Sequence, residues 1–315
     1  MYKRMSLKYL PEGALLNLPR NKAFIGSRKG LESAQKLGEI LEAVALSCDN
    51  DLNLTVRLGE GLVGVIPRRE ATLPLPDRKE KDIAVISRVG KAVCFKVLGF
   101  GKKDNRPCVF LSRRAAQEDC LENHLRHLLP GQILSVRVTH EEPFGAFVDI
   151  GCGIVSLLSI DCISVSRISH PRDRFACGDF LRAAVKCIDR QTGRIYMTEK
   201  ELLGSWEENA ALFEPGQTVT GLVRSIEDYG IFVELTPNLA GLAEYKEGVS
   251  VGDRATVFIK SINPERMKIK LVLIDSYKDF SAPAPLRYFL PEDCNRLSSW
   301  RYSPDCCPKS VGTVF

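Results

Sequence analysis

The chain has 315 residues, of which 44% are hydrophobic and 26% charged, and its formal net charge at pH 7 is +5. These values are typical of an ordinary soluble globular protein with two or three domains. The N-terminus lacks a signal-peptide layout, and no apolar run is long enough to span a bilayer, so we expect a cytoplasmic protein without a membrane segment. The eleven cysteines form no Cys-x-x-Cys pair, which favours reduced thiols and neither metal nor cofactor.

The first 34 residues show no sustained hydrophobic period, and Pro11, Pro19 and Gly26 interrupt them. We therefore predict an N-terminal extension over residues 1–34. From Gly38 the chain changes to short β-rich runs separated by turn residues. We expect strands at residues 40–46, 52–58, 62–66, 83–98 and 109–111. Five strands in so short a segment predict a small β-barrel over residues 35–114.

The first predicted barrel carries a local excess of positive charge. Between Arg68 and Arg114 there are thirteen Lys or Arg and five Asp or Glu. Two interpretations remain open, a face that binds phosphates and a solvated surface that is merely basic. The next segment, residues 115–129, contains neither Gly nor Pro and places Ala115, Leu121 and Leu125 at helical spacing. It predicts a helical linker that ends at Pro130.

The remainder of the chain is organised by a repeat. Phe144-Gly-Ala-Phe-Val-Asp returns as Tyr229-Gly-Ile-Phe-Val-Glu, an offset of 85 positions from 144 to 229, and Pro130-Gly-Gln returns as Pro215-Gly-Gln at the same offset. In the first copy we expect strands at residues 133–139, 144–150, 154–158, 180–188 and 194–198. In the second we expect them at residues 219–226, 231–235, 240–243, 255–262 and 268–274. The domains are then 130–200 and 215–274, with a helical linker at 201–214 and an unassigned tail at 275–315.

A long connection follows the third strand of the first copy, from Asp161 to Gly178, and carries Arg167, Arg172 and Arg174. Such long connections in a small domain are often functional. The arginines are candidate phosphate contacts, with solvated loop charges as the alternative. Five short strands with a long connection after the third are typical of the five-stranded Greek-key barrel called the OB-fold. These barrels bind oligonucleotides with aromatic rings that stack on bases and cations that meet phosphates.

Several segments resemble the S1 RNA-binding domain, the repeat of bacterial ribosomal protein S1. They are Gly131-Gln-Ile-Leu-Ser-Val-Arg-Val, Phe144-Gly-Ala-Phe-Val-Asp-Ile-Gly, Phe180-Leu-Arg-Ala-Ala-Val-Lys, Asp189-Arg-Gln-Thr-Gly-Arg-Ile-Tyr-Met, Gly216-Gln-Thr-Val-Thr-Gly-Leu-Val and Tyr229-Gly-Ile-Phe-Val-Glu-Leu. The resemblance is specific over residues 130–274, weaker over 38–114, and absent from the first thirty residues and the tail. It implies an all-β protein of three tandem five-stranded OB-fold barrels of S1 type, joined by short helical linkers.

The resemblance also implies site residues. In residues 130–200 these are Phe144 and Phe147 for base stacking and Asp189 and Arg194 for polar backbone contacts. For the two phenylalanines, an inward position in the core is the alternative. In residues 215–274 they are Tyr229, Phe232, Asn263 and Lys268. Ser159 and Glu244 stand where the family often has a histidine, and Asp51-Leu-Asn-Leu replaces the aromatic pair in the first barrel.

Catalytic motifs are missing from the sequence, which has no Walker-type glycine loop, Gly-x-Ser-x-Gly elbow or His-Glu-x-x-His. We therefore predict a non-catalytic protein that binds single-stranded RNA. The S1 resemblance implies messenger RNA at the small ribosomal subunit as its partner. We expect the principal site in residues 130–200, which alone combine an aromatic pair, Arg194 and the arginine-rich connection. Two alternatives remain, a scaffold that docks on the ribosome or on an RNA-processing nuclease, and the accessory region of a ribonuclease.

Overall fold

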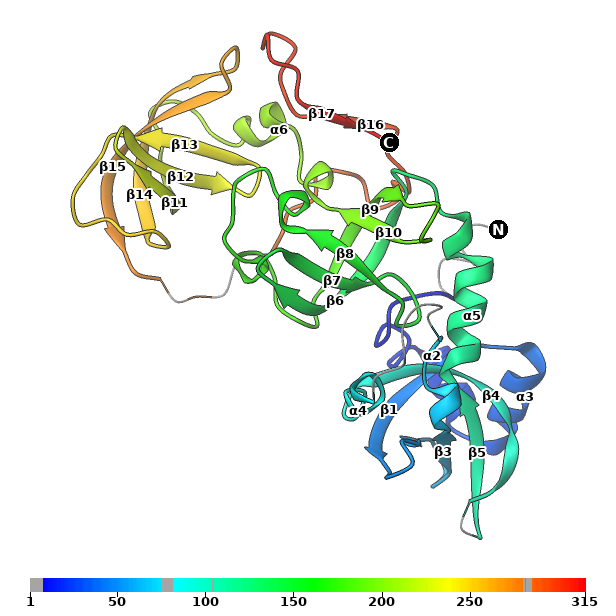
Figure 1. Ribbon diagram of the computed structural model, residues 1–315. Coiled ribbons are helices and arrows are strands. Elements are labelled where there is room, and N and C mark those ends of the chain that lie inside the picture. Colours follow the sequence, from blue (N-terminus) through cyan, green and yellow to red (C-terminus); the bar gives the residue numbers. More distant parts are fainter. Residues whose placement is uncertain (1–7, 75–81, 104, 280, 282–284) are drawn as a thin grey trace. The chain divides into compact units, whose positions relative to one another are not determined.

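The computed structural model describes residues 8–74, 82–103, 105–279, 281 and 285–315 (Figure 1). The chain divides into two compact units. The first comprises Met1–Leu128, Ser135–Arg137 and Asp149–Val155, and the second comprises Leu129–Leu134, Val138–Val148 and Ser156–Phe315. Among the described residues, no helix combines the length and apolarity needed to cross a membrane.

The first barrel consists of five strands closed in the order β1-β2-β3-β5-β4. They are β1 Leu41–Cys48, β2 Leu54–Arg57, β3 Val63–Ile66, β4 Ala92–Lys103 and β5 Arg106–Ser112. Its core contains Leu41, Leu54, Ile66, Phe95 and Leu111, each of them almost wholly buried. Between β3 and β4 lie the short helices η1 Arg68–Glu70 and α4 Ile83–Ile86.

One strand prediction for the first barrel is wrong. Residues 83–98 do not form one strand, because their apolar start is helix α4 and the strand begins only at Ala92. A short apolar run is compatible with either state, and tertiary packing decides between them. The described part of the predicted N-terminal extension, residues 1–34, contains α2 Pro19–Ile25 and most of α3 Arg28–Leu37. Part of the basic stretch, residues 78, 79 and 81, lies outside the described residues.

Helix α3 shows how such a short element forms. The Ser27 side chain accepts a hydrogen bond from the Gly30 amide at its start, and Gly38 at its end adopts a left-handed φ of 63°. These are the usual capping residues at the two ends of a helix. The helix buries Leu31 and Ala34 in the core of the first barrel. Packing of this narrow apolar stripe stabilises a helix that would be marginal in isolation.

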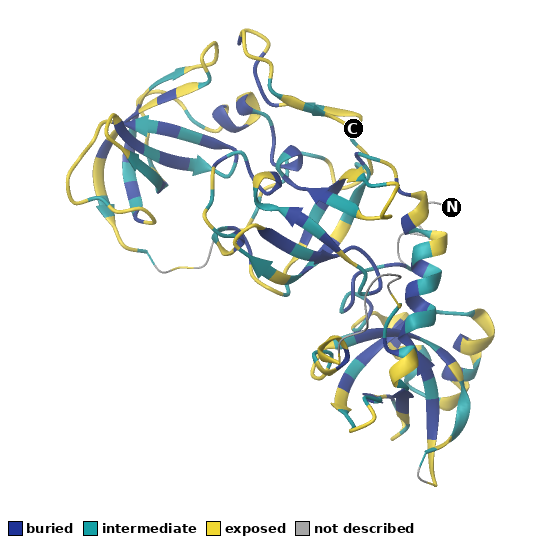
Figure 2. Cartoon of the chain, in the orientation of Figure 1, coloured by how far each residue is buried: buried dark blue, intermediate teal, exposed yellow. Residues whose placement is uncertain are grey.

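The second and third barrels share one strand order with the first, closed as β10-β8-β7-β6-β9 and β11-β12-β13-β15-β14. The second is built from β6 Ile133–Glu142, β7 Gly145–Asp149, β8 Val155–Ser159, β9 Phe180–Ile188 and β10 Ile195–Thr198. The third is built from β11 Thr218–Glu227, β12 Gly230–Thr236, β13 Leu239–Ala243, β14 Arg254–Asn263 and β15 Lys268–Tyr277. Buried residues alternate with less buried ones along strands such as β13 and β15 (Figure 2). An all-β fold of the OB type is confirmed.

The connections are shorter and more broken than the sequence suggests. The predicted helix at 115–129 is α5 Arg113–Asn123 followed by the 3-10 turn η2 Leu125–His127. The predicted linker helix at 201–214 is reduced to η5 Lys200–Leu202 and α6 Trp206–Ala210. Gly204, with φ 84°, separates these two turns, and a capping box between Ser205 and Glu208 starts α6. Two further 3-10 turns, η3 Ile160–Cys162 and η4 Pro171–Asp173, lie in the connection between β8 and β9.

The C-terminal tail is part of the second unit. It ends in a hairpin of β16 Ser299–Arg301 and β17 Gly312–Val314. Upstream, the Leu297 amide donates to the Gly131 carbonyl at 2.9 Å and thereby extends the hydrogen bonding at the start of the second barrel. The Trp206 amide donates to the Tyr302 carbonyl at 2.9 Å, and the Tyr302 hydroxyl donates to the Asn238 carbonyl at 2.7 Å. The tail is therefore bonded to both barrels of its unit.

Candidate nucleic-acid interface

The aromatic pair of the second barrel is created by a glycine at the start of β7. Gly145 has φ 153°, and a Cβ atom there would lie 2.5 Å from the Leu158 carbonyl oxygen, so a side chain is excluded. The sharp bend breaks strand alternation and brings two rings three positions apart into contact. Phe144 is 55% exposed and Phe147 half-buried, with ring centroids 6.0 Å apart at 88°. This edge-to-face arrangement is favourable for aromatic rings.

A third ring extends this pair. The His140 ring on β6 stacks on Phe147, with centroids 6.2 Å apart and planes at 22°. The Nε2 atom of His140 lies 2.8 Å from the Glu142 carboxylate. We call His140, Phe144 and Phe147 the aromatic cluster. His140 was not among the site residues predicted from sequence, and the pairing of β6 with β7 places it beside Phe147.

Two further residues of this face lie on β8 and β10, the next strands of the barrel after β7. Leu157 and Tyr196 are half-buried and lie opposite each other in the parallel pair of these strands. Their chain neighbours Leu158 and Met197 are buried in the core. Because side chains alternate along a strand, Leu157 and Tyr196 point outward, as Phe147 does beside the buried Val148. Tyr196 is a second aromatic that the sequence-based choice of site residues omitted.

The polar residues predicted for this barrel have different roles. Arg194 is exposed at the entrance to β10. Asp189 organises the preceding turn, because its carboxylate accepts hydrogen bonds from the Thr192 hydroxyl at 2.5 Å and the Gln191 amide at 2.9 Å. The Thr192 hydrogen bond, with the Gln191 amide, lowers the pKa of the Asp189 carboxyl. Asp189 thus stays charged and orders the turn that presents Arg194.

The three loop arginines are not equivalent. Arg167 and Arg172 are exposed, whereas Arg174 is only 6% exposed. The Arg174 Nη1 and Nη2 atoms lie 2.8 and 2.7 Å from the two carboxylate oxygens of Glu234. The prediction that Arg174 contacts phosphate does not fit this geometry, because its guanidinium is buried and already paired with a carboxylate in bidentate fashion.

The third barrel repeats the aromatic pair with nearly the same geometry. The Tyr229 and Phe232 ring centroids are 6.1 Å apart at 89°, and Tyr229 is 69% exposed. Gly230 has φ 149°, and a Cβ there would lie 2.4 Å from the Ala243 carbonyl oxygen. Phe232 pairs with Leu242 across β12 and β13, and Leu242 pairs with Lys270 on β15. Across the sheet, Phe232 is therefore followed by Leu242 and then by the cation Lys270.

The remaining predicted residues of the third barrel lie at the turn that joins β14 to β15. Asn263 and Lys268 face each other as the closing pair of this hairpin, and both are exposed. The Asn263 side-chain oxygen accepts a hydrogen bond from the Arg266 amide at 2.9 Å, so it shapes the turn. Glu244 is exposed and lines a shallow hollow with Tyr245 and Lys246.

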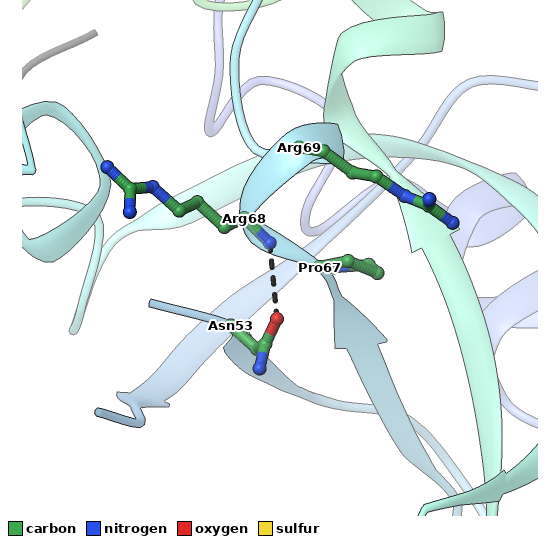
Figure 3. A pocket seen from close by; sticks show the side chains of 4 residues that line it. All are labelled: Asn53, Pro67, Arg68 and Arg69. Carbon is green, nitrogen blue, oxygen red and sulfur yellow. Dashed lines mark hydrogen bonds between the residues drawn. The ribbon is translucent and has the colours of Figure 1, made fainter. Parts of the chain in front are cut away.

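The first barrel has a basic hollow where the others have aromatics. Asn53, just before β2, and Pro67, Arg68 and Arg69, just after β3, line it (Figure 3). The Arg68 amide donates to the Asn53 side-chain oxygen at 3.2 Å, and the two arginine side chains extend in opposite directions. The Arg68 guanidinium is 2.6 Å from the Asp82 carboxylate. The Arg69 Nε atom is 3.9 Å from the Glu70 carboxylate. Each of the two cations thus has a carboxylate nearby, closely so for Arg68.

Comparison with known proteins agrees with this geometry. The family model described as "S1 RNA binding domain" matches residues 129–200, which span the second barrel. The chain is also 30% identical over 261 residues to the small ribosomal subunit protein bS1 of Neisseria meningitidis serogroup B, an alignment that covers 76% of this chain and 44% of that protein. The chain therefore contains an S1 RNA-binding domain, at residues 129–200. This S1-domain protein is likewise 33% identical over 163 residues to the bS1 homolog of Bacillus subtilis, over 50% of its own length and 42% of the homolog's.

The S1-domain protein spans less than half the length of these two relatives. Among solved structures, a multidomain protein with nucleic acid binding domains from Streptococcus pneumoniae is similar over 75% of this chain and 73% of its own. That similarity has 15% sequence identity and a TM-score of 0.25.

Proposed function

We propose that this S1-domain protein is a non-catalytic, cytoplasmic protein that binds single-stranded RNA on the aromatic faces of its second and third barrels. The observation that carries the proposal is the repeated edge-to-face pair, Phe144 with Phe147 and Tyr229 with Phe232. In each pair the first ring is more than half exposed. Exposed rings beside cations on a barrel face suit bases that stack while phosphates meet positive charge.

We further propose that all three barrels are S1-type domains, at residues 35–114, 130–200 and 215–274. The second would be the principal RNA site. Its aromatic cluster has three rings, whereas Ser225 pairs with Phe232 at the place in the third barrel that corresponds to His140. The first barrel, which has a basic hollow in place of rings, would contribute electrostatic contacts alone.

The names of the relatives suggest the setting. Both are proteins of the small ribosomal subunit or homologs of one. We propose that this protein binds messenger RNA at that subunit. A scaffold that docks on the ribosome or on a nuclease is the competing function, and the exposed apolar residues Val272 and Ile274 on β15 favour it. In that case the barrels would bind a protein and contact RNA little.

A salt-titrated filter-binding assay tests the proposal. The full chain is mixed with a single-stranded oligouridylate of about 12 nucleotides, because one OB-fold covers roughly 4–16 nucleotides. RNA binding through stacked rings and phosphate contacts predicts saturable binding that weakens linearly on a log–log plot against salt. Duplex RNA of the same length is the control, since paired bases cannot stack on the rings. Equal binding of duplex and single strand, or no binding at low salt, would contradict the proposal.

A further inference from the structure

The connection between β8 and β9, residues 160–179, belongs by sequence to the second barrel, yet its side chains bond to the third. We call it the β8–β9 loop. Arg174 binds both carboxylate oxygens of Glu234 on β12, and its Nη2 atom also lies 3.0 Å from the Ser164 hydroxyl. Both partners of the ion pair are buried, with side chains 4% and 8% exposed. A buried bidentate pair is geometrically specific, and removal of one partner leaves an uncompensated charge.

A second arginine strengthens this attachment. Arg224 on β11 lies 2.7 Å from the Glu234 carboxylate and 3.3 Å from the Asp173 carboxylate of the β8–β9 loop. The loop and the third barrel thus each contribute one guanidinium group and one carboxylate to this cluster, and the formal charges cancel. The cluster fixes the position of the loop without adding net charge to it.

The other end of the loop is held by hydrogen bonds that two of its backbone amides donate to the third barrel. The Val165 amide donates to the Asn238 side-chain oxygen at 3.0 Å, and the Ser166 amide donates to the Pro237 carbonyl at 3.0 Å. Asn238 is itself buried, and its amide nitrogen donates to the Lys200 and Gly204 carbonyls, both at 2.8 Å. The loop is thus fixed at two places, on the β12–β13 turn and on the middle of β12.

The second of these places adjoins the aromatic pair of the third barrel. Phe232 and Glu234 are two positions apart on β12, with the core residue Val233 between them, and they pair in regular register with Leu242 and Ala240. Their side chains therefore leave the strand on the same side, about 7 Å apart along it. The β8–β9 loop consequently covers β12 beside the outward-facing Phe232.

We propose that the β8–β9 loop of the second barrel completes the RNA site of the third. The exposed Arg167 and Arg172 flank the two attachment points, so a strand stacked on Tyr229 and Phe232 that continues along β12 meets their guanidinium groups with its phosphates. Arg174 is a positioning residue that holds these cations in place. The inference rests on the proposed RNA binding and changes which barrel the loop serves.

A double-mutant cycle in the full chain tests which face the loop serves. Arg172→Ala, an exposed change, is combined separately with Phe232→Leu and with Phe147→Leu, and binding of the oligouridylate is measured against salt. A lost phosphate contact to a single strand lowers the log–log slope by about 0.7, which corresponds to roughly fivefold weaker binding at 0.1 M salt. We expect this loss in the wild-type and Phe147→Leu backgrounds and its disappearance in the Phe232→Leu background, because residues that bind the same stretch of strand are not additive.

Three outcomes overturn the inference. The Arg172 effect could vanish with Phe147→Leu and persist with Phe232→Leu, it could persist in both backgrounds, or Arg172→Ala could leave affinity and slope unchanged. A failure of RNA binding as such is seen separately, because the wild-type chain would then show no saturable binding.

Arg174→Lys tests the positioning role, since lysine keeps the charge and loses the bidentate geometry. With the fold verified by circular dichroism, we expect a reduction in salt slope at least as large as in Arg172→Ala, because both loop cations lose their position. Addition of Arg172→Ala to Arg174→Lys should then give no further reduction. A wild-type slope for folded Arg174→Lys would show that Arg174 does not position the loop cations.

Discussion

Replacement of Phe147 by leucine separates base stacking from packing. Phe147 lies at the centre of the aromatic cluster, 6.0 Å from the Phe144 ring and 6.2 Å from the His140 ring. It is half-buried, so an alanine would remove contacts that hold the face together. Leucine keeps most of the apolar volume but has no aromatic face, and volume-conserving apolar exchanges are well tolerated in proteins.

The expected loss follows from the number of rings. A stacked base contributes about 1–3 kcal/mol, which corresponds to roughly five- to 150-fold in the dissociation constant. Phe147→Leu also deprives Phe144 and His140 of their common neighbour, so we expect an effect in the upper half of that range. The corresponding Phe232→Leu should cost less, because Ser225 pairs with Phe232 where a third ring would stand.

The assay is filter binding of the oligouridylate at three salt concentrations, after circular dichroism has shown that each variant is folded. Phe180→Leu is the control for loss of an exposed aromatic, since Phe180 is 49% exposed at the start of β9, outside the strands that carry the aromatic cluster. Stacking should change affinity and leave the salt slope unaltered. A larger loss for Phe232→Leu than for Phe147→Leu would show that our ranking of the two barrels is wrong, and equal losses for all three variants would refute stacking at the aromatic cluster.

Three further predictions concern the second unit and the thiols. Burial raises the pKa of the Glu199 carboxyl to about 8, so the folded chain retains a proton that the unfolded chain releases near pH 4.5. Stability should therefore fall as pH rises from about 4.5 to 8, by up to about 1.4 kcal/mol per pH unit for this group, and Glu199→Gln should remove that dependence. Tyr302→Phe deletes the buried hydrogen bond to the Asn238 carbonyl and should cost about 1 kcal/mol. In the native protein a thiol reagent should first modify the three exposed cysteines, Cys177, Cys187 and Cys306. After denaturation it should modify all eleven cysteines of the chain.

Intrinsic fluorescence is a convenient measurement for the first two, because Trp206 and Trp300, the two tryptophans of the chain, both belong to the second unit. Denaturation midpoints are compared at pH 5 and pH 8 for wild type and Glu199→Gln. An unchanged pH dependence in that variant would contradict a raised pKa. A Tyr302→Phe midpoint equal to wild type would show that the hydroxyl contributes nothing net, and a native disulfide or stoichiometric zinc would contradict the expectation of reduced, metal-free thiols.

The sequence by itself determined the repeated units and their aromatic pairs. Gly145 and Gly230 stand at the same offset, each before a strand of alternating pattern and each just after an aromatic residue. Strand alternation and the need for glycine at a sharp bend are properties of neighbouring residues, so a local pattern records them. The outward position of Phe147 and Phe232 was expected only from the S1 resemblance, because strand alternation alone puts residues three apart on opposite faces.

Tertiary structure alone decided the role of Arg174 and the course of the tail. Arg174 resembles any loop arginine in sequence, but it pairs with Glu234, sixty positions away, and becomes a buried link between two barrels. His140 likewise becomes part of the aromatic cluster through the pairing of β6 with β7, and Tyr302 acquires its partner from the third barrel. The physical reason is that hydrophobic period and turn chemistry depend on adjacent residues. Burial of a charge depends instead on which distant surface covers it, and local patterns carry no record of that.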